Sequence, residues 1–486
     1  MKAKWTVIAG VGVAAWVGAE GAVSFGPAGS EVIGALAGDQ AAWGDVDGDG
    51  WLDLFAGGTV WRNRGGKGFT SVAAPAGLAR ALIADLDGDG KGDLVGFTPL
   101  AFWRTRVSSA GELAFEPMAL PELPATSSCA AACADVDGDG RLDVFVAGYE
   151  DWEKQLTFPS FLLRNAGEKG FALAWTSAEH RSRSVAACDF DEDGDLDWYV
   201  SNYRLQPNDL WVNDGQGAFA NEAKARNALA TSGDFPGGHS IGACFGDFDG
   251  DGHVDLFAGN FAHVDERGDQ PKSRFLRNAG AAGGWRFEDR GECGLAYQES
   301  YAVPACGDFD RDGRLDLYVT TVYAMASFHQ PNFPVLMRNV SEGAALRFVD
   351  TTEDAGLGGL PPTYMAACAD FDRDGDLDLA TAGKLYVGAA PTARHWLEVR
   401  VTGDGKRVAR DAAGVQVRVR SAKEPAQTWT RSVELGSSTG NANGTVLHFG
   451  LGDRGGPVEV ELRGPKGLRA TRTLEGVDRL VELAFD

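Results

Sequence analysis

The chain has 486 residues, of which 44% are apolar and 66 are glycine, and its formal net charge is −24. This length allows more than one packed domain, and so many glycines predict frequent turns rather than long helices. The strong negative charge argues against nucleic acid and anionic membranes as partners. We therefore expect an all-β repeat protein with some other kind of partner.

Residues 1–22 have the layout of a secretory signal peptide. Lys2 and Lys4 precede a nearly uncharged apolar run over residues 5–18, and small residues follow it. The run is shorter than the about 20 residues that a membrane-spanning helix requires, although an uncleaved anchor remains an alternative. We expect a mature chain without a membrane span that is secreted, periplasmic or at the cell surface.

One pattern recurs seven times along the chain, D-x-D-x-D-G-x-x-D followed by an apolar residue. Successive copies start 40, 50, 54, 58, 61 and 62 residues apart. This spacing is the length of one small four-stranded sheet with its loops, as in a propeller blade. The repeat therefore predicts a seven-bladed β-propeller over residues 23–390, with one aspartate loop in each blade.

The residue types of each loop are those of a calcium site. Carboxylates at positions 1, 3, 5 and 9, with the backbone carbonyl of position 7 and a water, give six or seven oxygen ligands, which suits Ca²⁺ better than the smaller Mg²⁺. Glycine at position 6 allows the positive φ of a tight turn. The predicted ligands at positions 1, 3, 5, 7 and 9 of the seven loops are Asp45, Asp47, Asp49, Trp51 and Asp53; Asp85, Asp87, Asp89, Lys91 and Asp93; Asp135, Asp137, Asp139, Arg141 and Asp143; Asp189, Asp191, Asp193, Asp195 and Asp197; Asp247, Asp249, Asp251, His253 and Asp255; Asp308, Asp310, Asp312, Arg314 and Asp316; and Asp370, Asp372, Asp374, Asp376 and Asp378. The sequence thus predicts about seven bound calcium ions.

The EF-hand is the obvious alternative, because its loop begins in the same way. An EF-hand needs a bidentate glutamate at position 12 and helices on both sides. Position 12 is Ala, Gly, Val or Thr here, as at Ala56 and Val146, and residues 142–146 read as a short strand. The pattern favours a strand-loop-strand site. Because each loop supplies its own ligands, we expect the calcium to be structural.

Other motifs recur in register with the loops. An apolar-Arg-Asn sequence, usually with glycine close behind, predicts an inner strand that ends in a hairpin turn. It occurs at residues 61–63, 163–165, 276–278 and 337–339. An aromatic-led strand follows in several repeats, but the last repeat lacks one, whereas residues 23–26 have that character. We therefore expect the N-terminal strand to complete the last blade and hold the two ends of the propeller together.

The composition changes from His395 onward. The acidic loops stop and longer alternating strands follow, as at residues 396–401 and 415–420. Several such strands within residues 391–486 predict a small β-sandwich-like domain.

Both parts resemble known families. The D-x-D-x-D-G-x-x-D-L repeat with its N-x-G and F-x-x-x-x-x-A-G-L companions resembles the FG-GAP or VCBS repeat of integrin-alpha-type propellers over residues 23–390, which implies calcium within the blades and a role in adhesion or ligand binding. Residues 395–397, 436–438 and 447–452 resemble the ASPIC and UnbV domain of the cartilage acidic protein family and its bacterial relatives. Residues 440–443 depart from the polar turn usual in that domain.

The cysteines read as small buried strand residues rather than as a disulfide framework. The chain has seven, an odd number, and five of them lie one to three residues before an aspartate loop. These five are Cys133, Cys188, Cys244, Cys306 and Cys368.

No catalytic motif is found, and two function classes stay open. The first is an extracellular scaffold that binds a protein or a glycan through the aromatic-bearing insertions at residues 149–152, 202–204 and 323–325. The second is a polysaccharide lyase or hydrolase with its site at the mouth of the central channel. His239 and His263, which flank the fifth loop in sequence, could line a pocket or only stabilise the loop.

Overall fold

The computed structural model describes residues 22–265, 268–325, 330–421 and 427–485, and its fold is almost entirely β. The all-β prediction is confirmed. The predicted signal peptide lies outside the described residues except for Ala22. Within the described ranges, no helix is long and apolar enough to cross a membrane.

In the described part of the chain, residues 24–389 form seven antiparallel sheets, each built around one aspartate loop. From the first strand to the last, the sheets consist of β2 (Ala41–Gly44), β3 (Asp53–Ala56), β4 (Thr59–Asn63) and β5 (Phe69–Ala73); β6 (Arg80–Ala84), β7 (Asp93–Thr98), β8 (Leu100–Val107) and β9 (Leu113–Met118); β10 (Ser128–Ala134), β11 (Asp143–Gly148), β13 (Leu156–Asn165) and β14 (Phe171–His180); β15 (Ser182–Cys188), β16 (Asp197–Asn202), β17 (Asp209–Asn213) and β18 (Phe219–Asn221); β19 (His239–Gly246), β20 (Asp255–Phe261), β23 (Arg274–Asn278) and β24 (Phe287–Gly291); β25 (Tyr301–Gly307), β26 (Asp316–Thr321), β27 (Val335–Asn339) and β28 (Phe348–Asp350); and β29 (Ala366–Ala369), β30 (Asp378–Thr381), β31 (Lys384–Ala389) and β1 (Ser24–Pro27). Two short pieces, β12 (Glu150–Asp151) on β13 and the hairpin of β21 (Val264–Asp265) with β22 (Gly268–Asp269), extend the loops.

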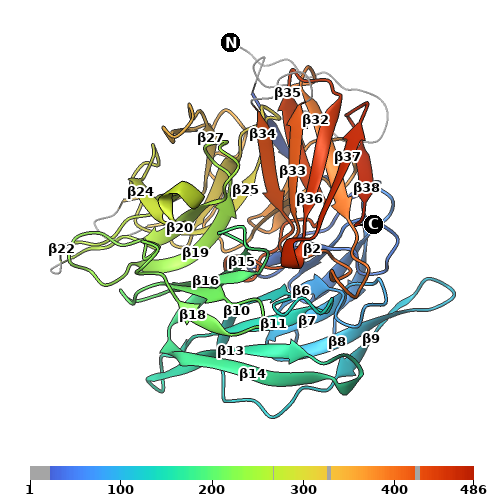
Figure 1. The fold of residues 1–486 in the computed structure, drawn as a ribbon, viewed down its shortest axis with the longest axis horizontal. Helices are drawn as coiled ribbons and strands as arrows, with labels where there is room; N and C mark the ends of the chain where they lie inside the picture. Colours follow the sequence, from blue (N-terminus) through green and yellow to red (C-terminus); the bar gives the residue numbers. More distant parts are fainter. Residues whose placement is uncertain (1–21, 266–267, 326–329, 422–426, 486) are drawn as a thin grey trace.

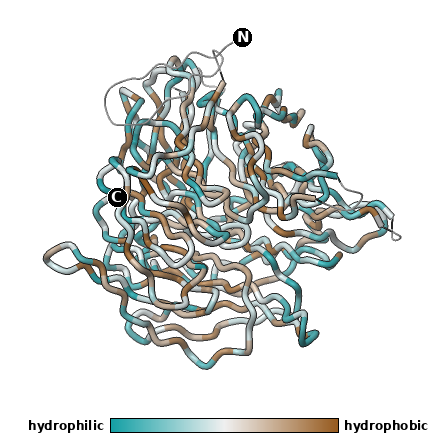
Figure 2. Tube along the Cα trace, turned by 180° about the vertical axis from the view of Figure 1, so that it is seen from behind, coloured by the Kyte–Doolittle hydropathy of each residue, from teal (hydrophilic) through white to brown (hydrophobic). Residues whose placement is uncertain are grey.

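The sheets form a closed ring. The first strand of each sheet contacts the first strand of the next, from β2 and β6 around to β29, which contacts β2 again. Apolar side chains fill the space between neighbours; Phe55 of the first sheet and Ile83 of the second belong to one buried cluster. Figure 2 shows brown, apolar stretches along the strands in the middle of the molecule. This arrangement is a β-propeller with the first strands innermost.

The N-terminal strand completes the last sheet, as predicted. β1 pairs with β31 in antiparallel register, with Ser24 opposite Ala389 and Pro27 opposite Tyr386. Phe25 is buried and packs edge-on against Phe309 of the preceding sheet, with ring centroids 5.7 Å apart. The first and last repeats are therefore joined by main-chain hydrogen bonds.

The C-terminal module (residues 391–485) is a sandwich of two sheets around its own apolar core. One sheet has the order β35 (Leu447–Gly452), β32 (His395–Val401) and β38 (Leu480–Leu483), and the other has β34 (Thr428–Ser432), β33 (Gln416–Ser421), β36 (Val458–Arg463) and β37 (Arg469–Leu474). Figure 1 shows these strands, coloured orange to red, packed together at one side of the ring. The predicted β-sandwich is thus present.

The ring has two different faces. Every aspartate loop joins a first strand to a second strand, so all seven loops lie on one side, here called the loop face. The first strands begin, and the second strands end, on the opposite side, the far face.

Two sequence interpretations need correction. The apolar-Arg-Asn motifs do not end an inner strand; they end the third strand of their sheets, as Asn63 does in β4. His239 and His263 do not lie beside the fifth loop, because β19 and β20 carry them to the far face. By contrast, the structure agrees with the prediction that the cysteines do not form a disulfide framework: all seven are free, and four are buried.

A segment of the C-terminal module fills the centre of the ring. This segment, residues 434–444, is called the plug here. Its backbone bonds to the first strands of several sheets, with Leu435 facing Cys133 of β10 and Ala442 facing Ala42 of β2. Ser438 is fully buried; its carbonyl accepts from Val185 and its hydroxyl donates to the carbonyl of Ala243. The two modules are therefore one interlocked unit.

Asn441 ties the plug to the sheets on both sides of the ring closure. Its Oδ1 accepts the N–H groups of Ala41, at 3.0 Å, and of Ala366, at 3.2 Å. Its Nδ2 donates to the carbonyl of Tyr364 at 2.9 Å. We expect Asn441→Ala to lower the free energy of unfolding by about 3 kcal/mol, because it leaves buried backbone groups without partners. Urea unfolding in saturating calcium measures this loss, with the exposed Gln216→Ala as the control; equal small effects of both substitutions contradict the role of the plug.

Candidate metal centre

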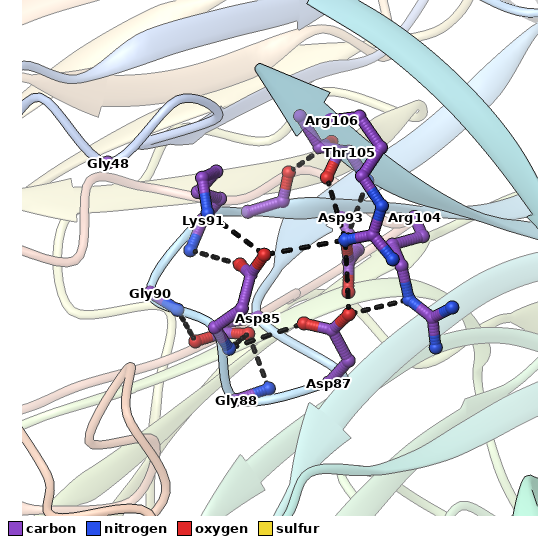
Figure 3. A network of polar contacts seen from close by, with 12 residues as sticks. Gly48, Asp85, Asp87, Gly88, Gly90, Lys91, Asp93, Arg104, Thr105 and Arg106 are labelled. Atoms are coloured by element: carbon purple, nitrogen blue, oxygen red, sulfur yellow. Dashed lines mark hydrogen bonds and ion pairs between the residues drawn. The ribbon is translucent and has the colours of Figure 1, made fainter. Parts of the chain in front are cut away.

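Each aspartate loop is a turn closed by its own carboxylates. The position-1 carboxylate accepts the N–H of the position-6 glycine at 2.7–3.1 Å in all seven loops. These glycines have φ between +84° and +95°, which other residues rarely adopt. The position-5 carboxylate accepts the N–H of position 7, as Asp89 does from Lys91. Figure 3 shows this arrangement around Asp85 and Gly90 of the second loop.

The position-9 aspartate connects the loop to the rest of its sheet. One of its oxygens accepts a backbone N–H of the third strand at 2.7–3.0 Å in all seven sheets. In six loops the other oxygen accepts the N–H of position 2 at 2.8–3.3 Å. For Asp53 the two donors are Asn63 and Val46. This carboxylate therefore fixes both ends of the loop.

The asparagine of the apolar-Arg-Asn motif joins neighbouring sheets. Asn165 donates from Nδ2 to the carbonyl of Leu86, which is position 2 of the preceding loop, at 2.7 Å. The same bond recurs at 2.7–2.9 Å in five sheets, including the one from Asn63 to Phe371 across the ring closure and one from Asn213, which follows a valine instead of an arginine. Five of the seven loops are thereby bonded to the third strand of the following sheet.

The arginine of that motif contacts the position-3 carboxylate of its own loop. Arg164 lies 3.2 Å from Asp137, and Arg338 lies 2.6 Å from Asp310. In the second loop Arg104 makes the equivalent contact with Asp87, at 2.5 Å (Figure 3). The sequence showed these arginines but not this role.

The carboxylates converge as a cation site requires. In each of the first four loops, one oxygen from each of positions 1, 3 and 9 lies within 4.8 Å of the others, and in the fifth loop positions 1, 3 and 5 do so. In the first four loops the structure thus groups three of the four predicted carboxylates and directs position 5 to the loop backbone.

The fourth loop shows most directly that a cation fits. Asp189 Oδ1, Asp191 Oδ1 and Asp197 Oδ2 are buried and have no hydrogen-bond partner among the described residues. These three residues form one of the convergent groups. Unpaired buried carboxylate oxygens are costly, and a hard divalent cation is the partner that such a set of oxygens selects. When bound, the ion neutralises charge; it supplies no reaction chemistry in this arrangement.

The electrostatics agree with this interpretation. Burial raises the pKa of Asp45 to about 6 and that of Asp53 to about 8, and neighbouring carboxylates add to both shifts. Burial likewise raises the pKa of Asp143 and of Asp247 to about 8. Without a cation, these buried carboxyl groups therefore stay protonated to a higher pH than a solvent-exposed aspartate does.

The C-terminal module covers the loop face and binds the loops directly. The position-6 carbonyls of four loops accept hydrogen bonds from it. Arg400 donates to Gly50, the N–H of Lys466 to Gly194 at 3.2 Å, Arg418 to Gly252 at 2.9 Å, and His448 Nε2 to Gly375 at 2.8 Å. Burial lowers the pKa of His448 to about 3, so its imidazole is neutral and donates through Nε2–H. Sequence reasoning treated the module as separate and missed this docking.

The insertions predicted for a binding face do come together on the far face. The Arg204 guanidinium lies 4.0 Å from the ring centroid of Trp152, and Glu150 pairs with Arg204 and Arg181. His239 packs edge-on against Tyr203, with centroids 4.9 Å apart.

Comparison with known proteins identifies both parts. A family model described as an FG-GAP-like repeat matches residues 45–96, 135–200 and 189–258, and one described as ASPIC and UnbV matches residues 405–485. FG-GAP-like repeats and an ASPIC and UnbV domain are thus found in this chain. Cartilage acidic protein 1 of Mus musculus is 25% identical over 385 residues, and that of Homo sapiens is 24% identical over 419 residues.

The chain spans only part of the length of these relatives. The matches cover 73% and 77% of this chain but 54% and 58% of the two relatives. Among solved structures, the extracellular domain of a hybrid two-component system from B. thetaiotaomicron is 9% identical, with a TM-score of 0.43, over 96% of this chain and 60% of that one. This similarity is too distant to support an inference about function.

Removing one carboxylate of the fourth loop should remove one metal ion. We expect Asp191→Asn to lower the metal content by one ion per chain and to lower stability in excess calcium, by about 1.4 kcal/mol for each tenfold excess of calcium over the dissociation constant of the site. Elemental analysis and thermal melts measure both effects. The control is Asp214→Asn in an exposed hairpin turn; unchanged metal content in the Asp191 variant contradicts the ligand assignment.

The raised carboxylate pKa values predict a pH dependence. An unfolded aspartate titrates near 3.9, whereas burial gives Asp53 and Asp143 a pKa of about 8 in the metal-free fold. The folded state therefore binds more protons between about pH 4 and 8, so the stability of the chelated protein falls as the pH rises through that range. Calcium binds the ionised form, so the difference in melting temperature between calcium-loaded and chelated protein should widen from pH 5.5 to 8. A constant difference contradicts the account.

Proposed function

We propose that the chain is a secreted, calcium-binding β-propeller that acts as an extracellular scaffold, with about seven structural calcium ions and a binding surface for a protein or a glycan on the far face. The arrangement of the propeller and the C-terminal module supports this proposal. The C-terminal module covers the loop face and the plug fills the channel from that side. The far face is therefore the side left for a partner.

The far face has the composition of a binding surface. Trp152 is 57% exposed and Tyr323 is 55% exposed, although both side chains are large and aromatic. The two residues belong to separate sheets. Met325 and Tyr297 add to the exposed apolar surface. Aromatic groups of this kind, mixed with arginines, are enriched where proteins bind partners. The ion pairs of Glu150 hold two of these loops in position.

The alternative of a polysaccharide lyase or hydrolase has no comparable support. Its expected site at the channel mouth is restricted to the far face, because the plug fills the channel from the loop face. No geometry in the described residues favours bond cleavage over binding there.

A binding experiment tests the proposal. The calcium-loaded protein is applied to arrays of extracellular glycans and matrix proteins, and hits are measured by surface plasmon resonance. We expect the double variant Trp152→Ala, Tyr323→Ala to weaken binding at least tenfold, because these residues present large exposed rings. Val349→Ala, exposed on the outermost strand β28, is the control. Binding that is unaffected by the double variant contradicts the use of the far face.

A further inference from the structure

Arg183 occupies an unusual position at the far-face end of the channel. It lies near the start of the first strand β15, and its guanidinium is surrounded by three tyrosine rings. Its Cζ lies 4.8 Å from the ring centroid of Tyr149, 5.4 Å from that of Tyr203 and 5.5 Å from that of Tyr364. This arrangement is an aromatic cage around a permanent positive charge.

Arg183 has no anionic partner in the described residues. Its Nη1 donates to the hydroxyl of Tyr149 at 3.0 Å and its Nη2 to that of Tyr364 at 2.7 Å, and its Nε is buried without a hydrogen-bond partner. Burial raises the pKa of both tyrosines, so their hydroxyls stay neutral. The nearby Glu150 is already paired with Arg181 and Arg204. A half-buried guanidinium without a counter-ion is costly, in a chain that otherwise carries an excess of carboxylates.

A small pocket lies beside this guanidinium. Its volume is about 210 Å³, and its lining includes Arg80, Cys129, Arg183, Tyr364 and Thr439. The first four come from the propeller, whereas Thr439 belongs to the plug and reaches the pocket through the ring. The pocket is therefore complete only when the C-terminal module is docked.

The lining provides donors for an anion. Two guanidinium groups lie on it, although Arg80 also pairs with Asp39. The Tyr364 hydroxyl accepts from Arg183, which leaves its own proton to donate, and Thr439 carries a second hydroxyl. Guanidinium groups match planar carboxylates in particular. The volume lies below the range of sites for drug-sized ligands, so it suits one charged group or one sugar ring.

We propose that this pocket binds the carboxylate of an acidic sugar, with Arg183 as the charged partner and the exposed rings around the channel mouth contacting the neighbouring sugar units. The surroundings favour a sugar over an acidic peptide, because flat rings such as those of Tyr203, Tyr323 and Trp152 pack on the apolar faces of sugars. This inference rests on the proposed binding role of the far face and specifies its ligand.

The substitution Arg183→Met tests the proposal. The calcium-loaded full chain is titrated by calorimetry with oligogalacturonate, oligomannuronate and sialyllactose, and in parallel with methyl-esterified oligogalacturonate and hexaglutamate. We expect at least one carboxylated sugar to bind, its neutral ester to bind at least tenfold more weakly, and Arg183→Met to reduce affinity at least tenfold. Arg290→Gln, on the outer strand β24 and paired with Glu288, is the matched control and should leave affinity unchanged.

The melting temperature separates binding from a structural role. Arg183→Met removes a half-buried charge that has no counter-ion among the described residues, so we expect an unchanged or higher melting temperature together with the loss of binding. A large fall in the melting temperature of this variant shows that Arg183 only keeps the tyrosines in position, and it overturns the inference. Thr439→Val and Tyr364→Phe should each weaken binding while the fold is retained.

The other outcomes are also decisive. Binding of hexaglutamate alone, equal binding of ester and acid, or no binding across the sugar panel overturns the acidic-sugar inference. If the arrays still yield a partner that depends on Trp152 and Tyr323 but not on Arg183, the proposed scaffold function stands without it. If no partner of any class depends on the far face, the proposed function fails as well.

Discussion

The structure depends on the position-9 aspartate of each loop. Its carboxylate accepts a backbone N–H of the third strand in every sheet, and in six of the seven it also accepts one from the start of the loop, as Asp53 does from Val46. In five sheets an asparagine of the third strand extends this connection to the preceding loop, as Asn165 does to Leu86. One buried charge per sheet thus holds together the strands, the loop and the ring.

This design requires a counter-charge. A buried carboxylate with like-charged neighbours is unfavourable, and the seven loops carry 28 aspartates at positions 1, 3, 5 and 9, more than the whole net charge of −24. Arginines of the third strand neutralise part of this charge at position 3, as Arg164 does at Asp137. In the fourth loop the ion pair is longer, with Arg226 3.7 Å from Asp191, and three buried carboxylate oxygens are left for a cation.

The sequence predicted the features that depend on local chemistry. The loops, the glycine at position 6 and the strand that closes the ring each follow from a repeated pattern. It did not predict the plug or the caged arginine, because these depend on contacts between distant residues: Asn441 bonds to Ala41, 400 residues away, and Arg183 bonds to Tyr364, 181 residues away. Neither contact leaves a periodic signal. The docking of the C-terminal module likewise depends on hydrogen bonds to loop carbonyls, and the sequence does not reveal them.

The central claim is that the aspartate loops join the blades to one another and to the C-terminal module. Hydrogen exchange of the plug, residues 434–444, with and without calcium tests it most directly. The account predicts that chelation increases exchange in the loops and the plug together, because Gly50, Gly252 and Gly375 bind the C-terminal module to which the plug belongs. Faster exchange in the loops with an unchanged, protected plug would contradict it.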